Sequence, residues 1–274
     1  MAVRKMTALF VCVCLLAAVF CACGRAENLT VTFLKVGKAD AIVLRCGLGT
    51  VIIDTGETDD GEDLTAFLKA KGESTVDALI LTHFDKDHIG GAEPLLEAVS
   101  VGTVLMPDYA GTSDLYASLI LALSRTDVTV RRLTGEYGFS FGGAQIKVNA
   151  PAAYDSDEEE PDNDYSLIVT VTYGDTRMLF MGDAEDERIG QWLMAGSAER
   201  CGLIKMPHHG VYGKQLTALL DVVSPAYAVI CDSDKNPAEE KTLALLQERN
   251  VSVFETKNGD VTAVSDGNTI KVTK

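Results

Sequence analysis

Hydrophobic and polar residues alternate in three short runs near the start of the chain, over residues 29–36, 41–45 and 50–54. A period of two is typical of strands that bury one face. The second and third runs are separated by Gly47-Leu48-Gly49, a sequence that favours a turn. The pattern therefore predicts an antiparallel meander of three strands.

The rest of the chain alternates between helical and strand-like patterns. Residues 76–82 form a near-continuous apolar run, which is typical of a strand covered on both faces. Helices are expected over residues 60–71, 92–99, 113–123, 185–195, 214–220 and 237–249. Further strands are expected over residues 103–106, 128–133, 145–149, 203–206, 226–231, 251–255, 260–265 and 269–273. Residues 166–173 and 176–181 are expected to form a hairpin around Gly174 and Asp175.

These elements predict an α/β fold formed by one domain, residues 27–274. Two mixed sheets with helices on both outer faces would form a four-layer αββα sandwich. The chain has 274 residues, of which 47% are hydrophobic, so it has ample material for such a core. This composition excludes the disordered and fibrous classes of protein.

Residues 1–26 have the pattern of an export signal. Arg4 and Lys5 precede an uncharged run over residues 7–22, which has the length of a signal-peptide core rather than of a bilayer span. Two endings stay open. The Ala22-Cys23-Gly24 sequence resembles a bacterial lipoprotein box, with lipidation at Cys23, whereas cleavage after Ala26 would release a secreted protein. We expect an extracytoplasmic protein that contacts a membrane only through such a lipid anchor.

Cysteine spacing indicates no disulfide framework. Four of the seven cysteines lie within residues 1–26, which leaves Cys46, Cys201 and Cys231 for the domain, without a CxxC pair. We expect these three thiols to be small buried residues.

Charge narrows the range of partners. The chain has 24 Lys and Arg against 40 Asp and Glu, a formal net charge of −16. Proteins that bind duplex nucleic acid stably neutralise phosphates with a basic face, so no such binding is expected. The acid-rich run over residues 155–164 is predicted to be a solvated loop. The sequence predicts no particular oligomeric state.

All four histidines lie in two short motifs, each after a predicted strand. His83, Asp85, Asp87 and His88 fall within six residues. The second motif contains His208 and His209, and between the two motifs Asp183 follows Gly182 at the end of the predicted hairpin. Imidazole and carboxylate suit zinc and related metals, whereas calcium prefers oxygen ligands alone. The sequence therefore predicts a metal site.

The combination HxDxDHxGG, Gly-Asp and His-His-Gly, in that order, resembles the metallo-β-lactamase superfamily. Asp85 stands where the lactamases carry a second histidine, and this variant is similar to the soluble domain of the ComEC/Rec2 competence proteins. Residues 33–41, 51–56, 163–166, 205–210 and 259–267 are also similar to that branch. The resemblance covers about residues 29–274 and implies the four-layer sandwich of the superfamily.

The resemblance implies two divalent metal ions. His83 and Asp85 would bind the first metal ion, and Asp183 would bridge both. The second metal ion would be bound by Asp87, His88 and His208. The first site is poor in ligands, so zinc is expected overall, with manganese as an alternative at the first site.

The other residues of the expected site have supporting roles. His209 would either replace His208 as a ligand or contact the substrate. Ligand orientation is expected of Asp40 and Asp54, with capping of turns and strand ends as the alternative for both. The region where the lactamases carry another histidine contains Asn163 and Ser166, which are expected near the substrate.

The chemistry implied by this site is hydrolysis of a small-molecule or polymer phosphoester, by a hydroxide that bridges the metals. Asp87 would take part in catalysis as well as in metal binding. Lys86 would contact a phosphate, or else be a solvated lysine, and His209 or Tyr212 would protonate the leaving group. A phosphodiesterase or nuclease-like activity is the first expectation. The alternatives are a phosphorylcholine-type esterase of cell-wall polymers, a lactonase or thioesterase, and a non-catalytic lipoprotein in which the metals brace a binding module.

Overall fold

The computed structural model describes residues 27–151 and 163–274. The predicted export signal with Cys23, and residues 155–162 of the acid-rich run, lie outside the described residues. None of the helices in the described ranges has the length and apolar character of a membrane span.

The first sheet has eight strands in the order β15-β14-β1-β2-β3-β4-β5-β6. Pairing is antiparallel from β15 to β3 and parallel from β3 to β6. The predicted meander of β1, β2 and β3 is confirmed. The strands are β1 (Leu29–Phe33), β2 (Ala41–Cys46), β3 (Gly49–Thr55), β4 (Thr75–Ile80), β5 (Ser100–Pro107), β6 (Thr129–Leu133), β14 (Val261–Ser265) and β15 (Ile270–Thr273).

The second sheet has seven strands in the order β13-β12-β11-β10-β9-β8-β7. It is parallel from β13 to β10 and antiparallel from β10 to β7, so both sheets are mixed. The strands are β7 (Glu136–Phe141), β8 (Ala144–Asn149), β9 (Ile168–Tyr173), β10 (Thr176–Phe180), β11 (Leu203–Lys205), β12 (Tyr227–Ile230) and β13 (Ser252–Glu255).

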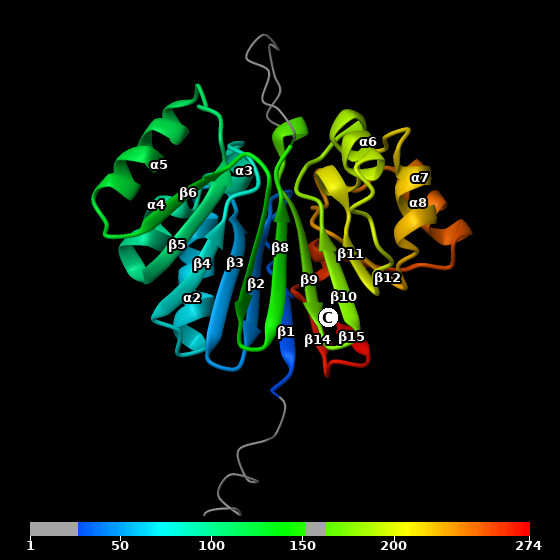
Figure 1. The fold of residues 1–274 in the computed structure, drawn as a ribbon, viewed down its shortest axis with the longest axis horizontal. Helices are drawn as coiled ribbons and strands as arrows, with labels where there is room; N and C mark the ends of the chain where they lie inside the picture. The colour runs from blue at the N-terminus through cyan, green and yellow to red at the C-terminus, as the bar shows by residue number, and fades with distance from the viewer. Residues whose placement is uncertain (1–26, 152–162) are drawn as a thin grey trace, which may run out of the picture.

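Helices cover the outer face of each sheet (Figure 1). Those on the first sheet are α2 (Asp60–Ala70), α4 (Ala92–Ala98) and α5 (Asp114–Ser124), and the one-turn helix α3 (Lys86–Ile89) lies at the upper edge in this view. Those on the second sheet are α6 (Asp186–Met194), α7 (Leu216–Val223) and α8 (Glu240–Glu248). Short 3₁₀ turns are η1 (Asn163–Tyr165), η2 (Pro207–Gly210) and η3 (Thr256–Asn258).

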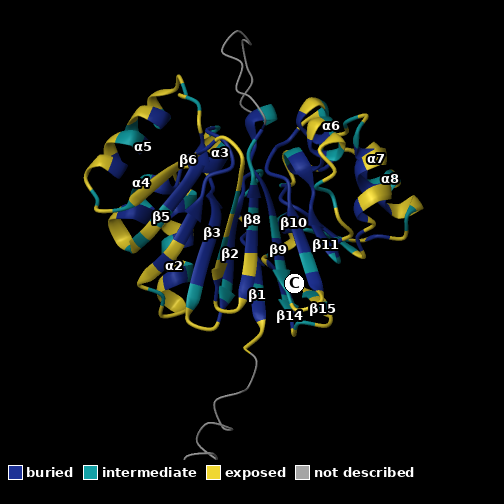
Figure 2. Cartoon of the chain, in the orientation of Figure 1, coloured by how far each residue is buried: buried dark blue, intermediate teal, exposed yellow. Residues whose placement is uncertain are grey.

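Three apolar cores separate these four layers, and the strands between them are largely buried (Figure 2). The central core joins the two sheets, with the rings of Phe33 and Phe180 stacked at 5.9 Å between centroids. The second core lies between the first sheet and α2, α4 and α5, and the third between the second sheet and α6, α7 and α8. The predicted αββα sandwich is confirmed.

Strand β7 and the one-turn helix α3 were not expected from the sequence. In β7 three aromatic residues, at positions 137, 139 and 141, alternate with polar or small residues, which is a strand pattern that the sequence analysis overlooked. Cys46, Cys201 and Cys231 are free and buried, as predicted.

The topology brings the ends of several strands to one edge of the sandwich. Strands β3 and β4 are parallel neighbours in the first sheet, and β10 and β11 are parallel neighbours in the second. The carboxyl ends of parallel strands lie at the same edge of a sheet. The loops after β4, β10 and β11 carry the two histidine motifs and Asp183, so this edge positions the candidate site.

Candidate metal centre

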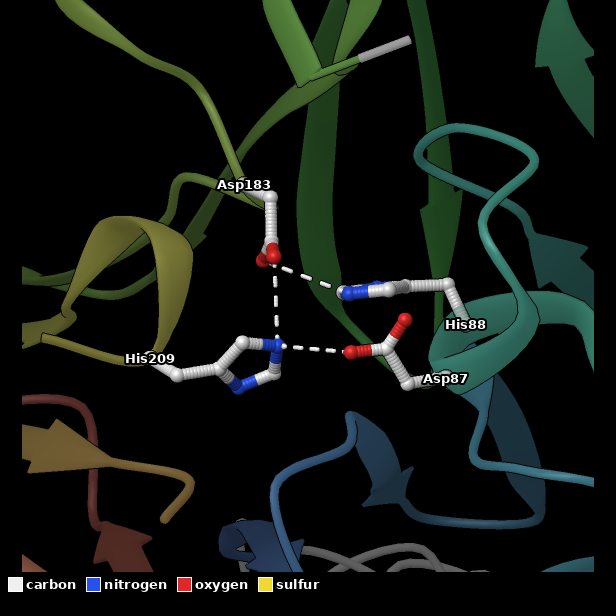
Figure 3. Close-up of side chains that lie close together, drawn as sticks. All are labelled: Asp87, His88, Asp183 and His209. Carbon is white, nitrogen blue, oxygen red and sulfur yellow. Dashed lines mark ion pairs between the residues drawn. The ribbon is translucent and has the colours of Figure 1, made fainter. Parts of the chain in front are cut away.

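Four side chains from three segments of the chain converge at this edge: Asp87 and His88 of α3, Asp183 after β10, and His209 of η2 (Figure 3). One ligand atom from each lies within 4.8 Å of all the others. His88 Nε2 is 3.3 Å from Asp183 Oδ1, and His209 Nε2 is 3.1 Å from Asp183 Oδ2. His209 Nε2 also lies 3.4 Å from Asp87 Oδ2. Asp183 is therefore the common partner of both imidazoles.

The first motif reaches this point because its loop packs tightly against β3. Asp85 precedes α3, and α3 carries Asp87 and His88. A Cβ atom at Gly91 would lie 2.3 Å from the carbonyl oxygen of Thr55, so only glycine permits this close approach.

Asp54 contacts the Nδ1 atom of His88, on the side of the ring that faces away from the cluster. Its Oδ2 lies 2.8 Å from His88 Nδ1, and its two oxygens accept hydrogen bonds from the backbone N–H and the hydroxyl of Thr82, both at 2.7 Å. An imidazole fixed at Nδ1 presents Nε2 in a defined direction, here toward Asp183. This is the contact that the expected orienting role of Asp54 requires.

The two histidines of the second motif point to different places. Both have positive φ angles, 42° at His208 and 51° at His209. His209 is buried, with Nδ1 2.8 Å from the carbonyl oxygen of Cys231 and Nε2 in the cluster. His208 lies outside the cluster, and its Nδ1 is 3.0 Å from Glu185 Oε1. Of the two histidines that the sequence leaves open, His209 is the one in the cluster, because the left-handed turn directs its ring inward.

His83 and Asp85 lie beside the cluster. His83 Nε2 is 3.6 Å from Asp85 Oδ2, and the His83 and His88 rings are 4.0 Å apart between centroids. His83 is fully buried, whereas the Asp85 side chain is partly exposed. His83 and Asp85 therefore form a pair of donors beside the cluster and outside its four residues.

The donor chemistry of these residues fits a dinuclear metal site. The buried Nε2 atoms of His83, His88 and His209 lie 3.1–3.6 Å from carboxylate oxygens but form no hydrogen bond of proper geometry. Buried polar atoms are normally hydrogen-bonded, so three imidazole nitrogens aimed at carboxylates favour a cation between them. The fit covers the donor set and leaves the identity of the metal open.

Ion-pair interactions within the cluster stabilise the charged forms of its histidine and aspartate side chains. Burial alone would lower the pKa of His209, but Asp183 and Asp87 raise that pKa to about 9. Burial would likewise lower the pKa of His88, but Asp183 and Asp54 raise that pKa well above its ordinary value. Burial would raise the pKa of Asp183, but His209, His88 and Lys205 hold it well below its ordinary value. Asp183 is therefore an anionic donor.

Lys205 is a component of the site that the sequence analysis missed. Its side chain is fully buried, and its Nζ forms an ion pair with Asp40 and donates a hydrogen bond to the carbonyl oxygen of Gly182 at 3.0 Å. Burial alone would lower the pKa of Lys205, but Asp40 and Asp183 raise it above its ordinary value. The sequence feature that could have indicated this role is the single lysine at the end of the apolar strand β11, just before the second histidine motif.

The remaining predicted residues surround the cluster. Ser166 is buried, and its hydroxyl accepts a hydrogen bond from the backbone N–H of Asp183 at 3.1 Å. Asn163 donates to Glu185 Oε1 at 2.8 Å, the same atom that lies next to His208. Lys86 is 75% exposed at its side chain and pairs with Glu57 at 3.2 Å.

A pocket of about 150 Å³ lies next to the cluster. His208 and Tyr212 line it, together with Glu185, Asp186 and apolar residues of α6 and the loop before α7. The structure therefore places Tyr212 at the wall of a pocket and Lys86 at the exposed surface of the metal loop.

Comparison with known proteins agrees with this geometry. The sequence model of the family described as the metallo-beta-lactamase superfamily matches residues 34–136. This segment contains the first histidine motif and the strands that position it.

Two curated proteins are similar to most of the chain. ComE operon protein 3 of Bacillus subtilis is 27% identical over 253 residues, which cover 84% of this chain and 32% of that protein. Recombination protein 2 of Haemophilus influenzae is 26% identical over 210 residues, which cover 74% of this chain and 24% of that protein. The chain thus spans about a third or less of the length of these relatives.

A solved structure shares the fold. The metallo-beta-lactamase fold protein YhfI from Bacillus subtilis superposes with a TM-score of 0.52 and 13% identity, over 84% of this chain and 98% of that chain.

Proposed function

Because the chain belongs to the metallo-β-lactamase superfamily, in the branch of the ComEC/Rec2 competence proteins, we propose that it is a dinuclear metal-dependent hydrolase of phosphoester bonds. The observation that carries the proposal is the convergence of Asp87, His88, Asp183 and His209, with buried imidazole nitrogens directed at carboxylates. A site of this composition suits divalent metals and hydrolytic chemistry.

Each residue has a role in this proposal. Asp87, His88 and His209 would hold one metal ion, His83 and Asp85 the other, and Asp183 would contact both. When bound, two divalent ions lower the pKa of water and offset negative charge that develops on a phosphate. Asp54 and the carbonyl oxygen of Cys231 fix the Nδ1 sides of His88 and His209, so that the Nε2 atoms stay directed inward.

The surroundings of the cluster support a phosphoester as substrate. Lys86 is exposed in the metal loop, where its ammonium would meet an anionic substrate. The pocket lined by His208 and Tyr212 would accept the leaving group. Duplex nucleic acid is a poor candidate because of the net charge of −16, so a small or single-stranded substrate is favoured.

A second candidate is a phosphorylcholine-type ester. The pocket beside the cluster is lined by Glu185 and Asp186 and by the ring of Tyr212, and no lysine or arginine lines it. Carboxylates and an aromatic ring suit a quaternary ammonium group better than an anionic one. Export, with lipidation at Cys23 or cleavage after Ala26, would bring the enzyme to cell-wall polymers and is part of this proposal.

The test combines metal analysis with hydrolysis assays. Purified protein is loaded with zinc or manganese and assayed with bis(p-nitrophenyl) phosphate, p-nitrophenyl phosphate and p-nitrophenyl phosphorylcholine. We expect about two metal ions per chain and chelator-sensitive hydrolysis of a diester. Preference for the choline ester would favour the second candidate. A metal-loaded protein that is inert to all three would contradict the phosphoesterase proposal, and lactones and thioesters would be the next substrates.

A further inference from the structure

We infer that Asp40 and Lys205 form a positioning pair, in which Asp40 holds the Lys205 ammonium so that Asp183 stays free to bind metal. The inference rests on the proposed metal site and gives a role to two buried residues that are not metal ligands in it. Both side chains are at most 1% exposed.

Lys205 has a complete set of partners behind the cluster. Its ammonium forms an ion pair with Asp40 Oδ2, donates to the carbonyl oxygen of Gly182 at 3.0 Å and lies 3.5 Å from Asp183 Oδ1. An ammonium group has three donors, so these three oxygens account for all of them. Asp40 is the nearest of the three partners, and Asp183 is the most distant.

The contact with Gly182 positions Asp183 through the backbone. Gly182 has φ of 53°, a left-handed conformation that turns the chain sharply before Asp183. Lys205 holds the carbonyl oxygen of this turn, and the Ser166 hydroxyl accepts from the N–H of Asp183 on its other side. The orientation of the Asp183 carboxylate is therefore fixed from two directions.

The charge of Lys205 makes Asp40 necessary. An ammonium 3.5 Å from Asp183 in a buried site competes with a divalent cation for the same carboxylate. Asp40 offsets this charge because it is the closer partner. With two divalent ions and Lys205, five positive charges would face the five carboxylates of the site, which are Asp40, Asp54, Asp85, Asp87 and Asp183. Removal of the whole pair preserves this balance, whereas removal of either member leaves a buried charge uncompensated.

Zinc affinity tests the inference. Zinc is titrated against a chromophoric chelator for the parent protein, Asp40→Asn, Lys205→Met and the double variant. In Asp40→Asn the ammonium turns to Asp183, and we expect zinc affinity to fall about tenfold or more. In the double variant the competing ammonium is gone, and affinity should return to within about threefold of the parent. Thermal unfolding of the metal-free proteins should show Lys205→Met to be less stable than the double variant.

The matched control is Asp221→Asn, which removes one carboxylate from the exposed pair of Asp221 and Arg249. Its zinc affinity should equal that of the parent. Unchanged affinity in Asp40→Asn would overturn the inference, and so would a double variant as weak as Asp40→Asn, because Asp40 would then act through another group, such as the His209 ring, whose Nδ1 lies 3.7 Å from Asp40 Oδ1. If Asp40→Asn does not fold, a folded double variant that binds no zinc overturns it equally. A parent protein that binds no metal would instead overturn the proposed function.

Discussion

Asp54 and His88 form the contact on which the orientation of the first histidine motif depends: Asp54 Oδ2 lies 2.8 Å from His88 Nδ1, and both side chains are fully buried. The aspartate itself has φ of 56°, an uncommon backbone conformation for a residue other than glycine. A strained residue that fixes a ring next to a cluster of donors is typical of a functional site.

Asp54→Asn should weaken metal binding. Asparagine tolerates the positive φ, but the variant replaces one carboxylate oxygen with an NH₂ group that cannot accept from His88 Nδ1. We expect zinc affinity to fall about 10- to 100-fold, as is usual when a group that orients a ligand is lost. Chelator competition measures this loss, and the control is Asp77→Asn, in which the side chain on β4 accepts from the N–H of Thr50 at the start of β3. Parent-like affinity in Asp54→Asn would show that Asp54 only supports the fold.

The two adjacent histidines should differ sharply in metal binding. Asparagine is compatible with the positive φ of both positions, so His208→Asn and His209→Asn form a matched pair. His209→Asn should lose about one metal ion per chain, since its Nε2 faces Asp183 and Asp87. His208→Asn should keep the metal content of the parent, because its ring pairs with Glu185 outside the cluster. Metal analysis after gel filtration decides, and the reverse pattern would make His208 the ligand.

Lys86→Ala should affect substrate binding more than turnover. The side chain is exposed and pairs with Glu57, so its loss leaves the metal cluster intact. For an anionic phosphoester we expect KM to rise about three- to tenfold with kcat within about twofold. Steady-state kinetics on bis(p-nitrophenyl) phosphate measure both constants. Lys271→Ala, exposed on β15, serves as the control and should leave both unchanged. Equal losses of kcat and kcat/KM in Lys86→Ala would instead assign Lys86 to the transition state.

The thiols of the domain should be inert in the native protein. Burial raises the pKa of Cys201 to about 12, although Arg177 opposes the shift, and burial also raises the pKa of Cys46. For Cys231, burial and then the Asp40 carboxylate raise the pKa well above its ordinary value. The thiolate is the reactive form, so none of the three should react with iodoacetamide at pH 8 until the protein unfolds. Peptide mass spectrometry before and after guanidinium treatment tests this, and rapid labelling of native Cys201 would contradict it.

Much of the fold was predictable because hydrophobic periodicity follows burial directly. Residues 76–82 are near-continuously apolar, and β4, which overlaps them, is covered on one face by the central core and on the other by helices. By contrast, β7 was missed although its aromatic residues alternate with polar or small ones, because Gly138 in its middle weakens the strand signal and the strand lies at the edge of its sheet. Local pattern reports burial well and edge pairing poorly.

The candidate site was predictable in composition but less so in detail. The spacing of His83, Asp85, Asp87 and His88 already indicates a shared site. The choice between His208 and His209 depends on two consecutive positive φ angles, which no residue type at those positions signals. The role of Lys205 depends on Asp40, Gly182 and Asp183, which lie far from it in sequence and meet it only in the folded chain.

The two groups of cluster residues belong to different halves of the sandwich. Asp87 and His88 follow a strand of the first sheet, whereas Asp183 and His209 follow strands of the second, about 100 residues later. No half of the chain has the complete donor set, so metal capture follows the docking of the two sheets during folding. A bound metal would then hold the two sheets together, and separation of the sheets would release the metal.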